Sequence, residues 1–167
     1  LAPTSSTTMT LMIGDAIAIS LLKMRGFDKS HFSKFHPGGN LGKDLVKLSE
    51  VMHGIKELPL VKENELMSKV LLVITKKSFG CVGVLNKSKN LVGIITDGDL
   101  RRNMKKDIIN KFAYEIMTKN PKMAKVNTLV GEALNIMNSK KITSLFVCID
   151  KKPTGIVHVH DLLRLSS

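Results

Sequence analysis

The sequence predicts an α/β (α+β) fold built by tandem duplication. The stretch NELMSKVLLVITKKSFGCVGVLN, which begins at Asn64, aligns without a gap with NTLVGEALNIMNSKKITSLFVCI, which begins at Asn127. Each copy then reaches a glycine, an apolar strand and an acidic turn, GIITDGDL in the first and GIVHVHDL in the second. Because duplicated half-cores bury their apolar faces against each other, the cleft between the copies is the first place to expect a ligand.

Each copy is expected to fold as helix, strand, strand and helix. In the first copy we predict a helix capped by Asn64 and ending near Lys77, strands near 81–85 and 91–96, and a short helix after Thr96. In the second we predict a helix capped by Asn127 and ending near Lys140, strands near 144–149 and 154–158, and a last helix ending near Leu165. Val, Ile, Leu and Phe dominate these strands, as a buried sheet requires.

Composition argues against a nucleic-acid-binding protein. The net charge of +12 comes almost entirely from lysine, and the chain has one tyrosine and no tryptophan. Nucleic-acid-binding faces concentrate arginine and aromatic groups, whereas these lysines are scattered in pairs. We therefore interpret them as a solvated surface whose field favours anionic ligands.

The compartment is expected to be the cytoplasm. Cys81 and Cys148 both lie in apolar, strand-like runs, which favours buried reduced thiols over a disulfide framework. The longest apolar stretches are interrupted by charges, and no charged start precedes an apolar signal core. Neither a membrane span nor a secretion signal is therefore predicted.

The first 48 residues do not belong to the duplication. They begin with LAPTSSTT, which we interpret as a start inside a larger protein, and apolar residues at helical spacing predict an amphipathic helix from Met9 to Lys23. Thr7 or Thr8 would cap this helix. A hydroxyl-rich helix start suits a phosphate group, and simple capping without a ligand explains the same residues equally well.

A tight turn is predicted at HPGGNLGKDL, residues 36–45. Pro37 and the glycines after it exclude regular structure, so His36 is displayed on a turn before a short helix from about Leu41. Taken alone, such a histidine is either an inert surface residue or a displayed imidazole.

The duplicated part resembles the tandem cystathionine-β-synthase-type (CBS) domain pair. Met52 and Met117 precede the two copies, which close with GIITDGDLR and GIVHVHDLLR. The resemblance implies CBS domains at 49–110 and 111–167 and a cleft that commonly binds nucleotides. It implies that a hydroxyl after the second strand and an aspartate three residues later contact the ligand. Thr96 and Asp99 match this pattern; in the second copy Asp161 matches, but His158 replaces the hydroxyl.

The residues around these turns allow other readings. Thr96 and Asp99 also form the sequence of a capping box, and Arg101 and Arg102 follow at a spacing suited to a phosphate or carboxylate. The remaining candidates for the same cleft are the hydroxyl residues Thr143 and Ser144. On a strand His158 and His160 would face the same side, and Asp161 follows. No metal is predicted there, because the strand ends about here and the spacing fixes no third ligand.

The combination of LAPTSSTT, the HPGG turn and a CBS pair resembles the rear half of the D-arabinose 5-phosphate isomerase family. The resemblance implies that 1–48 is the tail of a sugar isomerase (SIS) domain. It implies that the parent interconverts ribulose 5-phosphate and arabinose 5-phosphate in Kdo and lipopolysaccharide biosynthesis. In that intact parent His36 would be catalytic, with Thr7 and Thr8 at the edge of the sugar phosphate. The chain alone is expected to be inactive, because the family's sheet, carboxylates and lysine lie upstream.

The expected partners are small molecules and further copies of the chain. No cofactor is required; the implied effector is CMP-Kdo or an adenosine nucleotide. Apolar residues at helical spacing, Leu71, Ile74, Leu134 and Met137, suggest a homodimer of the chain, and the resemblance implies a homotetramer of the parent. A purely structural dimerisation module and a basic nucleic-acid-binding protein remain as alternatives; no membrane partner is expected.

Overall fold

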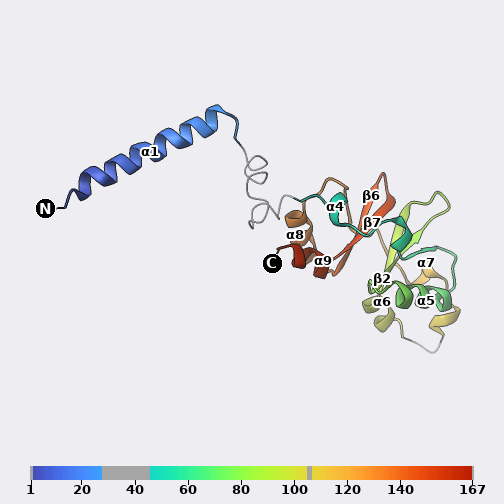
Figure 1. Ribbon diagram of the computed structural model, residues 1–167. Coiled ribbons are helices and arrows are strands. Elements are labelled where there is room, and N and C mark those ends of the chain that lie inside the picture. Colours follow the sequence, from blue (N-terminus) through green and yellow to red (C-terminus); the bar gives the residue numbers. More distant parts are fainter. Residues whose placement is uncertain (1, 28–45, 105–106, 167) are drawn as a thin grey trace. The chain divides into compact units, whose positions relative to one another are not determined.

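The computed structural model describes residues 2–27, 46–104 and 107–166 (Figure 1). The chain divides into two compact units, Leu1–Lys43 and Asp44–Ser167. The predicted His36 turn and the helix from about Leu41 lie outside the described residues. The two units are therefore treated separately.

The first unit contains helix α1, Thr4–Met24. It begins before the predicted start, with Pro3 as its N-cap, so the predicted cap at Thr7 or Thr8 is wrong. Both hydroxyls instead bond to carbonyl groups inside the first turns: Thr7 Oγ1 donates to Thr4 O at 3.0 Å, and Thr8 Oγ1 donates to Thr4 O at 2.9 Å. A role for the two threonines in sugar-phosphate contact stays a prediction.

Helix α1 is apolar on several faces. Leu11, Met12 and Ile13 follow one another and are all exposed, and no residue of the helix is buried within its unit. Successive residues point in different directions, so the predicted amphipathic stripe is wrong. By length and composition alone α1 would be able to cross a membrane; because the core helix of a soluble protein passes the same test, this is weak support for a span.

The second unit contains two small sheets and the helices that cover them. The first copy supplies α4 (Leu48–Val51), η1 (Ile55–Glu57), β1 (Leu60–Lys62), α5 (Met67–Lys77), β2 (Cys81–Leu85), β3 (Leu91–Thr96), α6 (Asp97–Arg102) and η2 (Ile108–Asn110). The second copy supplies α7 (Ala113–Ile116), β4 (Thr118–Lys119), β5 (Met123–Ala124), α8 (Val130–Lys140), β6 (Ser144–Ile149), β7 (Lys152–His158) and α9 (Val159–Ser166).

The sheets confirm the duplication. One has the strand order β1-β2-β3-β4 and the other β5-β6-β7. In each, the first strand pairs parallel with the second, which pairs antiparallel with the third. The α/β (α+β) prediction and its main strands are confirmed, and β7 begins two residues before the predicted strand.

The two copies exchange their leading segments, residues 46–53 and 111–118. Leu48 lies in the core of the second copy, whereas Ala113 and Ile116 lie in the core of the first. The backbone pairs accordingly: His53 bridges Ile156 of β7, and Thr118 pairs with Ile94 of β3. Each compact half therefore consists of the body of one copy and the leading segment of the other, and packing crosses the domain borders predicted from the sequence.

This exchange explains why the predicted helix caps are wrong. Helices α5 and α8 begin at Met67 and Val130, and Asn64 and Asn127 lie outside them. The Met67 amide donates to Lys111 O and the Val130 amide to Val46 O, both at 2.8 Å. Carbonyl groups of the exchanged segments therefore satisfy amides that side-chain caps would otherwise take.

Each leading segment places a methionine over a glycine of the opposite copy. A Cβ atom added to Gly93 would lie 2.8 Å from Met117 Cγ, and one added to Gly155 would lie 2.8 Å from Met52 Cγ and 3.0 Å from the backbone oxygen of His53. The glycines therefore make room for the exchanged segments.

A third apolar cluster joins the halves. It consists of Leu58, Phe79, Cys81, Leu91, Phe146, Cys148 and Ile156. Both cysteines are free and buried, as predicted, and burial raises the pKa of each thiol to about 11.

The apolar face proposed for dimerisation is partly used inside the chain. Ile74 and Met137 lie in the two cores, with 7% and 1% of their surface exposed, and Leu134 packs against the second core. Ile74 and Met137 therefore cannot form the predicted face, whereas Leu71 and Leu134 are only partly buried. The homodimer itself stays a prediction.

Replacing Gly155 should separate the exchanged segment from β7. We expect Gly155→Ala to lower the free energy of unfolding by about 1–3 kcal/mol, because the added methyl group meets Met52 and the fixed backbone of His53. The measurement is urea denaturation followed by circular dichroism. Gly54→Ala is the matched control, since nothing lies within 4 Å of its added Cβ. Equal midpoints for the two variants would contradict the close packing described above.

Candidate functional site

Two clefts lie between the halves of the second unit. The larger has a volume of about 1010 Å³ and the smaller about 410 Å³. The larger is lined by residues that include Thr96, Asp97, Asp99, Arg101, Arg102, Thr118, Lys122, Lys141, Thr143, Ser144 and His158. The smaller is lined by His53, Glu57, Lys76, Lys77, Ser78, Phe79, His158 and Asp161. The acidic turn of each copy therefore contributes to a different cleft.

Asp99 is the best-connected polar residue of the larger cleft. Its Oδ2 accepts from the Thr96 amide at 2.9 Å and from the Thr96 hydroxyl at 2.7 Å, which completes a capping box at the start of α6. Its Oδ1 accepts from Arg102 Nη2 at 2.8 Å and from Thr118 Oγ1 at 2.9 Å. Both carboxylate oxygens are therefore already occupied.

These bonds keep Asp99 ionised. Burial by itself would raise the pKa of its carboxyl, but the bonds from Thr96, Thr118 and Arg102 outweigh burial and hold the pKa below its ordinary value. The Asp99 side chain is only 7% exposed, whereas that of Arg102 is 69% exposed. The carboxylate is thus fixed, and its arginine partner reaches solvent.

The larger cleft combines cationic groups with an apolar wall. Arg101, Lys122 and Lys141 join Arg102, and cationic side chains outnumber the acidic ones, Asp97 and Asp99, by four to two. Ile74, Ile94 and Ile142 contribute apolar surface. An anion attached to a flat apolar group matches this lining.

Ser144 has a structural role in this cleft. Its hydroxyl is buried and donates to Phe79 O at 2.8 Å, which links β6 to the loop after α5. The neighbouring Thr143 is exposed and lines the same wall. Of the two predicted hydroxyls, Thr143 is therefore the one open to a ligand.

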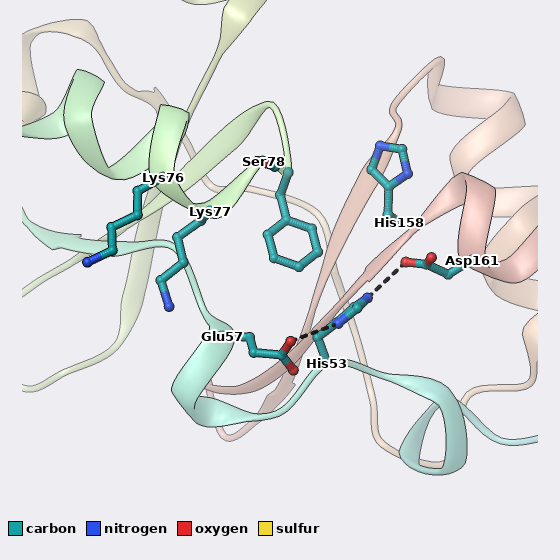
Figure 2. A pocket seen from close by; sticks show the side chains of 8 residues that line it. His53, Glu57, Lys76, Lys77, Ser78, His158 and Asp161 are labelled. Carbon is teal, nitrogen blue, oxygen red and sulfur yellow. Dashed lines mark hydrogen bonds and ion pairs between the residues drawn. The ribbon is translucent and has the colours of Figure 1, made fainter.

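A histidine between two carboxylates dominates the smaller cleft. His53 Nε2 lies 2.9 Å from Asp161 Oδ2, and His53 Nδ1 lies 3.4 Å from Glu57 Oε1 (Figure 2). The imidazole also packs edge-on against Phe79, with ring centroids 5.0 Å apart. The bond to Asp161 is the main cause that raises the pKa of His53; partial burial opposes it, and Glu57 adds to it.

His158 stands where the first copy has the capping hydroxyl of Thr96. The His160 amide donates to His158 Nδ1 at 3.3 Å, so an imidazole nitrogen takes the place of that hydroxyl at the start of α9. Burial, followed by the nearby His160, lowers the pKa of His158. Strand β7 ends at His158, so His160 is in the helix, and among the described residues no group of three His, Cys, Asp or Glu side chains is arranged to hold a metal ion.

The structure divides the predicted site residues. Seven of them line the larger cleft: Thr96, Asp99, Arg101, Arg102, Thr143, Ser144 and His158. Asp161 lies in the smaller cleft, which His158 also lines. Thr7 and Thr8 belong to the other unit, and His36 lies outside the described residues. Ligand contact by any of these residues stays a prediction.

The residues that sequence reasoning missed come from the leading segments and the loops after them. His53 and Thr118 directly follow Met52 and Met117, and each bonds to the aspartate of an acidic turn. The sequence does contain a signal for these residues. Met52 and Met117 are equivalent positions of the two copies, so the residues that follow them, His53 and Thr118, are also equivalent. The aligned stretches begin only after these segments, so their polar residues escaped notice.

Comparison with known proteins identifies the fold and its relatives. The CBS domain family matches residues 48–106 and 113–167. Arabinose 5-phosphate isomerase KdsD of Yersinia pestis is 44% identical over 98% of this chain and 51% of its own length, and KdsD of Escherichia coli K12 is 42% identical over the same shares. The chain thus spans about half the length of the curated relatives it matches.

Solved CBS structures support the same fold. CBSX2 in complex with AMP superposes with a TM-score of 0.62 at 22% identity, over 71% of this chain and 93% of that one. The CBS pair of protein MJ0100, in complex with 5′-methylthioadenosine and S-adenosyl-L-methionine, gives a TM-score of 0.65 at 22% identity, over 72% and 95%. With its exchanged leading segments, its two sheets and a sequence match to both copies, this chain belongs to the CBS domain family.

Proposed function

We propose that this chain is the regulatory CBS-pair portion of a D-arabinose 5-phosphate isomerase. The observation that supports this most is that the 42–44% identity to KdsD proteins extends over 98% of the chain, beyond the CBS pair into the first unit. The parent would interconvert ribulose 5-phosphate and arabinose 5-phosphate in the cytoplasm, for Kdo and lipopolysaccharide synthesis. In this proposal 1–48 completes the SIS domain, with His36 as an acid or base and Thr7 and Thr8 near the sugar phosphate.

The larger cleft is the proposed effector site. Its volume of about 1010 Å³ suits a nucleotide or nucleotide sugar, and its cationic rim suits a phosphate group. Two solved relatives in fold hold adenosine compounds, which favours an adenosine nucleotide; CMP-Kdo is the alternative effector.

Ligand binding would rearrange the bonds of Asp99. Since both of its oxygens are occupied, a ribose hydroxyl must replace one of the side-chain donors Arg102, Thr118 and Thr96. Arg102, whose side chain is 69% exposed, carries the charge that a phosphate attracts. We propose that the ribose takes the place of Arg102 on Asp99 and that the released guanidinium pairs with the phosphate.

The isolated chain should not isomerise arabinose 5-phosphate. The reaction must move a proton between adjacent carbons of a positioned sugar phosphate, and the family's carboxylates and lysine for this lie upstream. A coupled assay for ribulose 5-phosphate should therefore show no rate above background. Turnover close to that of a full-length KdsD protein would contradict the assignment of this chain to a regulatory part.

In the parent enzyme, His36→Ala should lower kcat. If His36 acts as general acid or base, the loss is roughly 10²–10⁴-fold. Steady-state kinetics of the full-length protein would measure it, with His31→Ala, a histidine of the same region outside the HPGG turn, as control. A change below threefold for His36→Ala would return this residue to a structural role.

AMP, ATP or CMP-Kdo should bind the larger cleft with an affinity that weakens as salt rises. At a hundredfold excess over Kd, the ligand should add about 2.7 kcal/mol to the free energy of unfolding. We expect Arg101→Gln and Lys122→Gln to weaken binding several-fold by calorimetry. Lys62→Gln, which changes an exposed lysine of β1 outside both clefts, is the matched control. No heat and no thermal shift with any of the three ligands would instead favour a purely structural module.

A further inference from the structure

The two clefts are duplicates in which one position has changed its chemistry. His53 and Thr118 each follow the methionine that covers a glycine, and each pairs through its backbone with the third strand of the opposite copy. Each also bonds through its side chain to the aspartate of an acidic turn, at 2.9 Å in both cases. The two residues are therefore equivalent, and the clefts can be compared position by position.

At this position the larger cleft has a small neutral hydroxyl and the smaller cleft has an imidazole. Thr118 leaves room beside Asp99, whereas the His53 ring extends from Asp161 towards Glu57 and packs on Phe79. The smaller cleft correspondingly has less than half the volume of the larger, about 410 Å³ against 1010 Å³. His53 thus fills space that the equivalent cleft leaves open.

The charges differ in the same direction. The residues that follow the leading segments contribute Glu57, at the end of η1, to the smaller cleft and Lys122 to the larger one. The positive charge that His53 acquires on protonation lies between two carboxylates and is balanced by them. Lys77 Nζ donates to Lys56 O at 2.6 Å, and Figure 2 shows Lys76 and Lys77 extending away from Asp161. A phosphate dianion entering beside Asp161 would therefore face two carboxylates, Asp161 and Glu57, at the end of the cleft that holds His53.

We propose that His53 and Glu57 are specificity-determining residues that keep phosphate-bearing ligands out of the smaller cleft. Each chain then binds one such ligand, in the larger cleft, although its two acidic turns descend from the same sequence. This inference depends on the proposed nucleotide function of the larger cleft. It specifies that only this cleft of the duplicated pair binds the ligand, and that His53 and Glu57 prevent binding in the smaller one.

Reciprocal exchange of the equivalent residues tests the proposal. AMP stoichiometry would be measured by native mass spectrometry and by calorimetry on the whole 167-residue chain. We expect one AMP per chain for the wild type. The double variant His53→Thr/Glu57→Gln should bind two, with the second Kd within about tenfold of the first. Thr118→His should lose the single AMP, or bind it at least tenfold more weakly, because the imidazole would fill the larger cleft.

Each result has a defined meaning. Two AMP molecules on the wild type, or one on a folded double variant, would overturn the role of His53 and Glu57 and leave the nucleotide function intact. No AMP on the wild type would overturn the adenosine-nucleotide assignment of the larger cleft and this inference with it. If the double variant does not fold, Glu57→Gln alone serves, since the Glu57 side chain is 59% exposed. A second, weaker AMP is then expected, and its absence at millimolar AMP would overturn the proposal.

Discussion

The exchange of the leading segments is the constraint on which the rest of the second unit depends. His53 and Ile156 donate to each other's carbonyl groups at 2.9 and 3.1 Å, which adds a short pairing to the edge of β7 that the second copy cannot supply for itself. Gly93 and Gly155 must be glycines because a methionine lies on each. Helices α5 and α8 begin without side-chain caps because carbonyl groups of the exchanged segments accept from the Met67 and Val130 amides. The same exchange brings His53 and Thr118 to the aspartates and so determines the polar chemistry of both clefts.

The sequence predicted the parts of the fold that depend on periodicity. The constant spacing of the copies located α5, α8 and the main strands, because apolar residues on a buried sheet face must recur in both copies. It failed where tertiary contacts replace local ones. Asn64 and Asn127 have good capping side chains, yet distant carbonyl groups satisfy the amides at Met67 and Val130. The amphipathic stripe predicted for α1 failed for a different reason, since Ile13 and Ile17 are also apolar and lie on its other faces.

The candidate site was predicted in its acidic turns and missed in its leading segments. Asp99 and Asp161 are recognisable in the sequence because each ends a repeated motif. In the structure both have a structural role that requires no ligand. Asp99 caps α6 and holds Thr118, while Asp161 holds His53. Each aspartate therefore anchors the leading segment of the other copy. In the proposed function, ligand contact at Asp99 would be coupled to the position of the segment that carries Thr118.

The exchanged segments also determine the order in which the two halves can fold during synthesis. A ribosome releases Leu48 long before Val157 and Leu162, the core residues against which it packs, so about a hundred residues must be synthesised before this contact can form. The core of the first copy can form after a shorter delay, because Ala113 and Ile116 are synthesised soon after the strands they cover. Long-range closure of this kind slows folding. The half that contains Ala113 and Ile116 can therefore be complete while Leu48 still lacks its partners in the second copy.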